Sequence, residues 1–240
     1  MESKHRDISL VALQGDQMLV IACDSCGAVG SKAGDQVKVP PHIVGKYTTR
    51  VAVMEVMATG AKPVAVTANI CNEPSPTGEE IMEGIRQELE EWDLKLPITI
   101  STEKNMPTAM TALGITLIGT VAKSQLMIGK ISPGDLVYSL GLPKIGDDVA
   151  ADQGEIADAR VMKKLLQLEG VKEIIPVGSS GIKGEVNKLA EAYQLRFDVL
   201  NDERLDMEKS AGPCTVVLVV TDRVFANTFE VPCYFIGKLE

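Results

Sequence analysis

The spacing of apolar and polar residues predicts a chain in which strands and helices alternate. Residues 8–13 and 18–22 are short apolar runs on either side of the turn residues 14–17, and this pattern indicates a β-hairpin. Other β-branched, apolar runs predict strands at residues 64–70, 96–102, 112–121, 136–140, 171–177, 196–200, 214–221 and 231–236. Because a hairpin occurs together with strand–helix–strand segments, we expect an α+β fold built on a mixed sheet rather than a doubly wound one.

Helical periodicity is clearest in the first half of the chain. Residues 44–60 place apolar side chains on one stripe with Glu55 at its rim, and Gly60 and Pro63 mark the end of this helix. Thr77 and Glu80 have the spacing of a capping box at the start of a second helix. The apolar side chains of that helix, which we interpret as core, are Ile81, Met82, Ile85, Leu89 and Trp92. Two further helices are predicted at residues 157–168 and 184–194.

Four acidic residues lie where predicted elements begin or end. Asp7 precedes the first strand, Asp24 and Glu103 follow strands, and Glu55 lies near the end of a helix. Carboxylates at such positions can converge on a hard cation such as Mg²⁺, which prefers oxygen ligands and usually brings phosphates with it. Acids at the ends of elements are also common as caps or solvated groups, and spacing alone favours that simpler interpretation.

A glycine-rich loop follows the hairpin. Gly27, Gly30 and Gly34 surround Lys32, so backbone N–H groups could approach a phosphate closely while the lysine supplies positive charge. A plain surface loop is equally compatible with these residues.

Composition and charge narrow the class of protein. The 240 residues carry a net charge of −9 with a single tryptophan, which argues against a nucleic-acid partner because such proteins rely on basic surfaces and stacking aromatics. No apolar run reaches the length of a membrane span, and the N-terminal residues lack the apolar region of a signal peptide. We therefore expect a cytoplasmic protein with no membrane partner.

The five cysteines do not form a recognisable framework. Cys23 and Cys26 have CxxC spacing, but His5 and His42 are not placed to complete a zinc site. A redox CxxC motif should open a helix, whereas this one is expected in a loop after a strand. We interpret these cysteines as structural or incidental.

Three segments carry a more specific pattern in a fixed order. Residues 22–32 are similar to a Thr-Asp-Gly-Val-Gly-Thr-Lys loop, and residues 55–63 to an Asn-Asp-(x)4-Gly-Ala-Lys-Pro helix end with Glu55 in place of Asp. Residues 101–107 are similar to a Gly-Gly-Glu-Thr-Ala-Glu-Met-Pro turn, one residue shorter. These motifs are those of aminoimidazole ribonucleotide (AIR) synthase and its relatives. The chain thus resembles the AIR synthase-like ATP-binding superfamily, which includes thiamine-monophosphate kinase, selenophosphate synthetase, a hydrogenase-maturation dehydratase and α-ribazole kinase.

The resemblance implies a two-domain fold and a homodimer. Residues 1–128 would form an ATP- and Mg²⁺-binding domain, with helices on one face of a mixed sheet, that dimerises. Residues 129–240 would form a smaller α/β domain.

The resemblance also implies roles for individual residues. Asp24 and Lys32 would act in catalysis. Mg²⁺ would be held by Asp7, Asp24, Glu55 and Glu103. ATP would contact Asp24, Gly30, Ser31, Lys32, Thr102 and Lys104. The small-molecule acceptor would receive the phosphoryl group by in-line attack.

The acceptor is selected only by elimination among the relatives. The N-terminus lacks the cysteine segment of a selenophosphate synthetase, the C-terminus lacks the terminal cysteine of the hydrogenase-maturation enzyme, and His5-Arg6-Asp7 replaces the Gly-Asp-Asp of a thiamine-monophosphate kinase. We therefore expect an α-ribazole kinase of cobalamin salvage, with another AIR synthase-like enzyme as the alternative. A non-catalytic nucleotide sensor is the other alternative, because Val177-Gly178-Ser179-Ser180-Gly181 lacks both acids of the Asp-Val-Ser-Asp-Gly turn found in related kinases. Gly146-Asp147-Asp148 and Asp152 could contact a substrate, although a solvated loop is the simpler interpretation.

Overall fold

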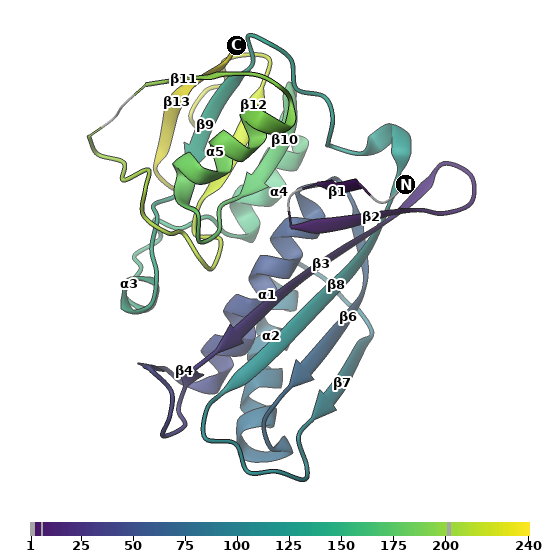
Figure 1. The fold of residues 1–240 in the computed structure, drawn as a ribbon, viewed down its shortest axis with the longest axis vertical. Helices are drawn as coiled ribbons and strands as arrows, with labels where there is room; N and C mark the ends of the chain where they lie inside the picture. The colour runs from purple at the N-terminus through teal and green to yellow at the C-terminus, as the bar shows by residue number, and fades with distance from the viewer. Residues whose placement is uncertain (1–2, 6, 201–202) are drawn as a thin grey trace. The chain divides into compact units, whose positions relative to one another are not determined.

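The computed structural model divides into two compact units, Met1–Leu126 and Met127–Glu240. It describes residues 3–5, 7–200 and 203–240, so Arg6 of the tripeptide at residues 5–7 lies outside the described residues. Each unit has its own sheet and its own helices (Figure 1). No helix in these described ranges combines the length and the apolar character needed to cross a membrane.

The N-terminal unit is built on a six-stranded sheet. Its strands, in spatial order, are β1 (Ser3–His5), β2 (Ile8–Ala12), β3 (Gln17–Gly27), β8 (Ala112–Ala122), β6 (Lys62–Ile70) and β7 (Ile98–Thr102). The β2–β3 pair is the predicted hairpin, and β6 and β7 run parallel while every other pair is antiparallel. The sheet is therefore mixed, as the sequence predicts. Buried and half-buried residues alternate along β8, because one face of the sheet is covered by helices.

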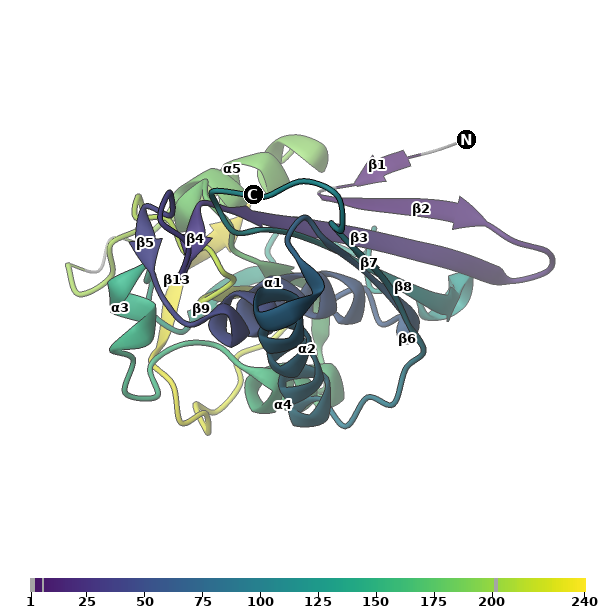
Figure 2. The same cartoon turned by 90° about the horizontal axis from the view of Figure 1, so that it is seen from below.

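Two helices lie on this side of the sheet and pack against each other (Figure 2). Helix α1 (Pro41–Met57) contacts β3 and β8, and α2 (Glu79–Glu91) packs on α1 after a π-helical turn at Pro74–Gly78. The two helices approach so closely that a Cβ on Gly45 would lie 2.1 Å from the carbonyl oxygen of Ile81. The predicted apolar face of α2 is confirmed, since Ile81, Ile85, Leu89 and Trp92 are each at most 4% exposed.

A buried ion pair joins the two helices. Arg50 on α1 donates from Nε to Oε1 of Glu88 on α2 at 3.0 Å, and Trp92 Nε1 donates to the same oxygen at 2.9 Å. The side chains of Arg50 and Glu88 are 4% and 0% exposed. Charges this deep are tolerated only when they are paired and hydrogen-bonded, so this network fixes the position of α1 against α2.

The remaining elements of the N-terminal unit are short. Strands β4 (Val29–Gly30) and β5 (Val37–Lys38) form a small parallel pair within the glycine-rich loop, and a 3₁₀ turn lies at Lys123–Gln125.

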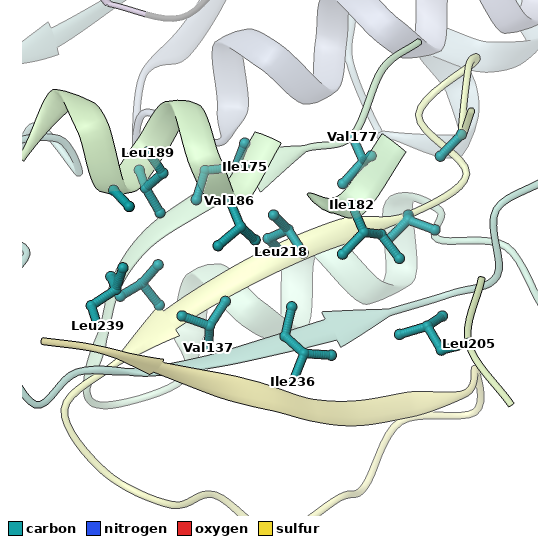
Figure 3. Packing of buried hydrophobic residues seen from close by; sticks show 14 residues of the cluster. Val137, Ile175, Val177, Ile182, Val186, Leu189, Leu205, Leu218, Ile236 and Leu239 are labelled. Carbon is teal, nitrogen blue, oxygen red and sulfur yellow. The ribbon is translucent and has the colours of Figure 1, made fainter. Parts of the chain in front are cut away.

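The C-terminal unit is built on a five-stranded sheet in which every pair is antiparallel. Its strands, in spatial order, are β10 (Val171–Pro176), β12 (Val217–Thr221), β9 (Leu136–Leu140), β13 (Cys233–Leu239) and β11 (Phe197–Val199). Helix α5 (Gly181–Ala192) covers one face, where Ile182, Val186 and Leu189 pack on strand residues such as Leu218 (Figure 3). All five residues of β12 are buried, so both faces of the sheet are covered. Helix α4 (Ala159–Gln167) contributes a separate set of buried residues, and α3 (Asp147–Ala150) is a single turn.

Several sequence predictions need correction. Thr77 does not form a capping box with Glu80: its hydroxyl donates to Glu73, and α2 begins after Gly78 without a side-chain cap. Helix α1 begins three residues before its predicted start, at Pro41, because proline is favoured at the first helical position; α5 also begins three residues early, at Gly181. Strand β3 continues to Gly27 because β8 pairs with it residue for residue through Ala112. Asp24 therefore lies within a strand rather than at its end, and the CxxC segment is part of that strand rather than of a loop.

Candidate functional site

Asp24 lies in β3 on the side of the sheet that faces α1. Residues at alternate positions of this strand point toward the helices, including Val20, Ala22 and Asp24, and Cys26 two residues later hydrogen-bonds Thr48 of α1. Asp24 is half-buried, and burial is the main cause that raises the pKa of its carboxyl to about 6; a hydrogen bond from Ser25 opposes the shift, and the nearby charge of Asp7 adds to it. A carboxylate that is costly to charge in the free protein is suited to a cation, which would offset that cost.

Asp7 is exposed at the start of β2, whose first residue, Ile8, pairs with Ala22. This pairing brings Asp7 close enough for its negative charge to raise the pKa of Asp24. The fold therefore places these two predicted metal ligands at the same end of the β2–β3 pair.

Glu55 and Glu103 occupy different settings. Glu55 lies in the last turn of α1 and is 8% exposed, so it is buried rather than at the rim of the apolar stripe. Glu103 follows β7, as predicted, and its carboxylate accepts the backbone N–H groups of Asn105 and Met106 at 2.7 and 3.1 Å. These backbone hydrogen bonds lower the pKa of Glu103, so this carboxylate is charged and fixed by its own turn.

The four acids do not form a preassembled metal cage. Within residues 7–200 and 203–240, no three His, Cys, Asp or Glu side chains come close enough to hold an ion. Mg²⁺ is commonly held by one or two carboxylates, with phosphate oxygens and waters completing its shell. The pair of Asp24 and Asp7 fits that requirement, whereas an all-protein cage does not fit these residues.

The glycine-rich loop is held in one shape by Asp35, a residue that the sequence did not single out. Asp35 is 4% exposed, and its carboxylate accepts hydrogen bonds from the N–H of Lys32 at 2.8 Å and from the N–H and hydroxyl of Thr111 at 2.7 Å each. Burial alone would raise the pKa of Asp35, but these hydrogen bonds outweigh it and lower the pKa. Gly30 permits the contact, because its φ is +152° and a Cβ there would lie 2.2 Å from Oγ1 of Thr111.

Lys32 pairs with Glu73, a second residue that the sequence analysis missed. Lys32 Nζ lies 2.7 Å from Oε2 of Glu73, and the hydroxyl of Thr77 donates to Oε1 of the same carboxylate. Partial burial would raise the pKa of Glu73, but the hydrogen bonds from Lys32 and Thr77 dominate and lower it to about 2. The loop that carries Lys32 is thus attached at two points, through Asp35 and through Glu73.

The segment after β6 is itself anchored. Asn72 is fully buried; its amide group donates to the hydroxyl of Thr108 at 2.7 Å and to the carbonyl of Met110 at 2.8 Å, and its side-chain oxygen accepts the N–H of Ala112 at 2.9 Å. These bonds fix the backbone next to Glu73. A polar residue between a strand and a Pro-Ser-Pro turn could have signalled such an anchor, although its partners lie far away in the sequence.

The other predicted ATP contacts lie near this loop or the turn after β7. Ser31 is exposed beside Lys32, Thr102 is the half-buried last residue of β7, and Lys104 is exposed one residue after Glu103. The structure gives none of these three a contact that identifies a ligand.

Cys23 and Cys26 cannot form a disulfide with each other. They are three residues apart in one extended strand and point to opposite faces of the sheet, so their Cα atoms are separated by roughly 10 Å, beyond the reach of a disulfide. This geometry supports the structural interpretation of the CxxC spacing.

In the C-terminal unit two of the three acids considered as substrate contacts, Asp148 and Asp152, are paired with lysines. Lys144 Nζ lies 2.6 Å from both Asp152 and Glu155, and Lys209 lies 2.7 Å from Asp148. At the turn before α5, Ser180 accepts a hydrogen bond from Lys188 at 2.7 Å. Lysine partners therefore compensate the negative charge of Asp148, Asp152 and Glu155.

Comparison with known proteins places this geometry in context. Residues 5–121 match the family described as AIR synthase related protein, N-terminal domain. No curated protein matches the chain. Among solved structures, thiamine monophosphate kinase from Aquifex aeolicus aligns with a TM-score of 0.68 and 16% identity over 99% of this chain and 90% of its own. A structure of the HypE–HypF complex aligns with a TM-score of 0.65 and 17% identity over 98% of this chain and 87% of the matched chain.

A third match has a much longer chain. Thermotoga maritima PurL in complex with ATP aligns with a TM-score of 0.62 and 18% identity over 98% of this chain, which spans only 37% of PurL. At these identities the alignments establish a shared fold.

Proposed function

Because residues 5–121 match the AIR synthase related N-terminal domain and the fold is shared with thiamine monophosphate kinase, we propose that the chain is an ATP-dependent phosphotransferase that uses Mg²⁺. The observation that carries the proposal is the half-buried Asp24 with its raised pKa, next to Asp7 and on the strand that leads into the glycine-rich loop. A folded protein retains such a carboxylate at a cost in stability, which is a feature of functional sites. Nucleotide complexes of two structural neighbours, T. maritima PurL with ATP and A. aeolicus ThiL with AMPPCP and TMP, agree with an ATP site on this fold.

In the proposed reaction the residues bind and orient rather than react covalently. Asp24 and Asp7 would hold Mg²⁺ together with phosphate oxygens, and Glu55 and Glu103 would complete the metal site once the nucleotide is bound; the bound ion would neutralise charge on the transferring phosphoryl group. The loop from Gly30 to Asp35 would present the side chain of Lys32 to the phosphates, with Gly30, Ser31, Thr102 and Lys104 as further contacts, whereas the N–H groups of Lys32, Gly34 and Asp35 are already engaged within the protein. The acceptor hydroxyl oxygen attacks the γ-phosphorus in line, the bond from that phosphorus to the bridging oxygen breaks, ADP leaves, and the hydroxyl proton passes to solvent.

For the acceptor we propose the nucleoside α-ribazole, whose free hydroxyl is phosphorylated during cobalamin salvage. The sequence at residues 5–7 lacks the Gly-Asp-Asp of thiamine-monophosphate kinases, which argues against a thiamine phosphate as acceptor. This departure favours an acceptor other than thiamine monophosphate, and α-ribazole is our choice by elimination.

We also propose that the chain forms a homodimer through the exposed face of the N-terminal sheet. Half-buried apolar side chains, such as Leu19 and Ile21 on β3 and Ile118 on β8, alternate with the buried residues that face α1. A second copy would cover them. Light scattering on the purified protein tests this: a monomer at micromolar concentration would contradict it.

The test of function is ADP formation from Mg²⁺-ATP with α-ribazole, thiamine monophosphate or formylglycinamidine ribonucleotide as acceptor. Turnover with α-ribazole alone supports the full proposal, and turnover with another acceptor keeps the reaction class but replaces the substrate. Nucleotide binding without turnover on any acceptor would favour a sensor on the same fold.

A further inference from the structure

We propose that Glu73 is a positioning residue that holds the ammonium group of Lys32 at the nucleotide phosphates. This inference rests on the proposed function and deepens it, because it assigns a role in the same site to a residue outside the motifs of the glycine-rich loop.

The contact itself is specific. Glu73 Oε2 accepts from Lys32 Nζ at 2.7 Å across 41 residues of sequence, and the two side chains are 35% and 17% exposed. Exposed lysine pairs are usually loose, because holding a long side chain in one geometry costs conformational entropy. The partial burial of Lys32 limits the alternatives open to its ammonium group.

Glu73 is prearranged to receive the lysine. Its second oxygen accepts the hydroxyl of Thr77, which is 4% exposed, and its backbone follows Asn72, which three hydrogen bonds anchor to residues 108–112. The carboxylate is thus fixed from two sides before it meets Lys32. Its pKa of about 2 keeps it charged throughout the neutral range.

The pair leaves Lys32 able to bind a ligand. An ammonium group has three protons, and Glu73 accepts only one of them, so two donors stay available for phosphate oxygens. Meanwhile the backbone of Lys32 is held by Asp35 through its N–H. Asp35 therefore fixes the backbone of this residue and Glu73 fixes its charged end, which is the arrangement needed to place a lysine on a transferring phosphate.

The decisive experiment compares Glu73→Gln with wild type in steady-state ADP formation. Glutamine keeps the shape of the side chain and removes its charge. Because placement of Lys32 affects the reacting geometry more than binding, we expect kcat to fall about tenfold or more and KM for ATP to change less than about threefold. The matched control is Glu79→Gln in the same segment: Glu79 is exposed and accepts a hydrogen bond from the hydroxyl of Ser75 at 2.9 Å, and its replacement should leave both constants unchanged.

Two further variants separate positioning from a general structural effect. Thr77→Val removes the hydroxyl that orients Glu73 and should lower kcat. Thr77→Ser retains the hydroxyl and should keep the kcat of wild type. In a Lys32→Met background, Glu73→Gln should have no additional effect on kcat, because Glu73 acts only through Lys32. The emission of Trp92 would confirm that each variant is folded.

The outcomes distinguish this inference from the function on which it rests. Wild-type turnover together with an unaltered Glu73→Gln variant would overturn the positioning role and leave the phosphotransferase intact. A Glu73→Gln variant that binds ATP more tightly at unchanged kcat would also overturn it, because Glu73 would then compete with phosphate for Lys32. A wild-type protein that neither binds nor cleaves ATP would overturn both.

Discussion

The buried pair of Arg50 and Glu88 gives a prediction whose size follows from the structure. In Glu88→Gln the charge of Arg50 stays buried, because a guanidinium does not lose its proton in proteins. Removing one partner of a buried ion pair costs about 3–5 kcal/mol. Glu91, which lies 3.5 Å from Nη2 of Arg50 and is 43% exposed, supplies partial compensation. We therefore expect a loss of about 3 kcal/mol in the unfolding free energy of the N-terminal unit, at the lower end of that range.

Trp92 makes this prediction measurable for one unit alone. It is the single tryptophan of the chain, is 2% exposed, and donates to Glu88 itself, so its emission reports unfolding of the α1–α2 layer. Urea unfolding followed by this emission should show a midpoint lowered by roughly 1 M or more, given slopes of about 1–3 kcal/mol per molar urea.

The matched control is Glu83→Gln on the exposed side of the same helix. Glu83 accepts a hydrogen bond from Gln87 at 3.2 Å in solvent, so its replacement should change stability by less than about 0.5 kcal/mol. Equal midpoints for Glu88→Gln and Glu83→Gln would refute the reasoning, since they would mean that the buried pair does not hold α1 to α2.

Three other variants test the glycine-rich loop, the carboxylate of Asp24 and the core of the C-terminal unit. Gly30→Ala should destabilise the N-terminal unit by about 1–3 kcal/mol, because its φ of +152° and the 2.2 Å approach to Thr111 leave no room for a Cβ; unchanged urea unfolding would contradict this. The pKa of Asp24 is raised from 3.8 to about 6, so the folded state binds its proton more tightly than the unfolded chain and stability falls as pH rises through that window. Asp24→Asn should remove this fall and, in metal-free buffer above pH 6, be at least as stable as wild type; a less stable variant would contradict the sign. Ser139 is fully buried on β9, and its hydroxyl has no hydrogen-bond partner among the residues described. Ser139→Ala should therefore lower the unfolding free energy by less than about 0.5 kcal/mol, measured by circular dichroism, and a larger loss would contradict this reasoning.

Much of the architecture could be predicted from periodicity. The hairpin of β2 and β3, helix α2 with its buried Ile81, and strand β8 follow from local patterns that the tertiary structure reinforces. The end of β3 could not be predicted, because polar residues around Asp24 resemble a loop and are extended only through pairing with β8.

The residues of the candidate site likewise fall into those that the sequence indicates and those that only the tertiary structure reveals. Asp24, Glu55, Glu103 and Lys32 are conspicuous in sequence as acids and a lysine near glycine or at predicted element ends. Glu73 and Asp35 were missed because their roles depend on partners 41 and 76 residues away, a distance that no local pattern reports. Thr77 was assigned to a capping box on spacing alone, and the nearby carboxylate of Glu73 took its hydroxyl instead.

The most direct test of the account is Mg²⁺-dependent ADP formation with α-ribazole, measured for wild type and for Glu55→Gln in parallel. Glu55 is buried on α1, and the variant keeps its shape while removing one proposed metal ligand. The account predicts turnover by wild type that requires both Mg²⁺ and α-ribazole and falls at least about a hundredfold in the variant, as for lost charge stabilisation of a transition state. Absence of ATP binding by wild type, or equal turnover by the two proteins, would contradict the metal–phosphate site proposed around Asp24.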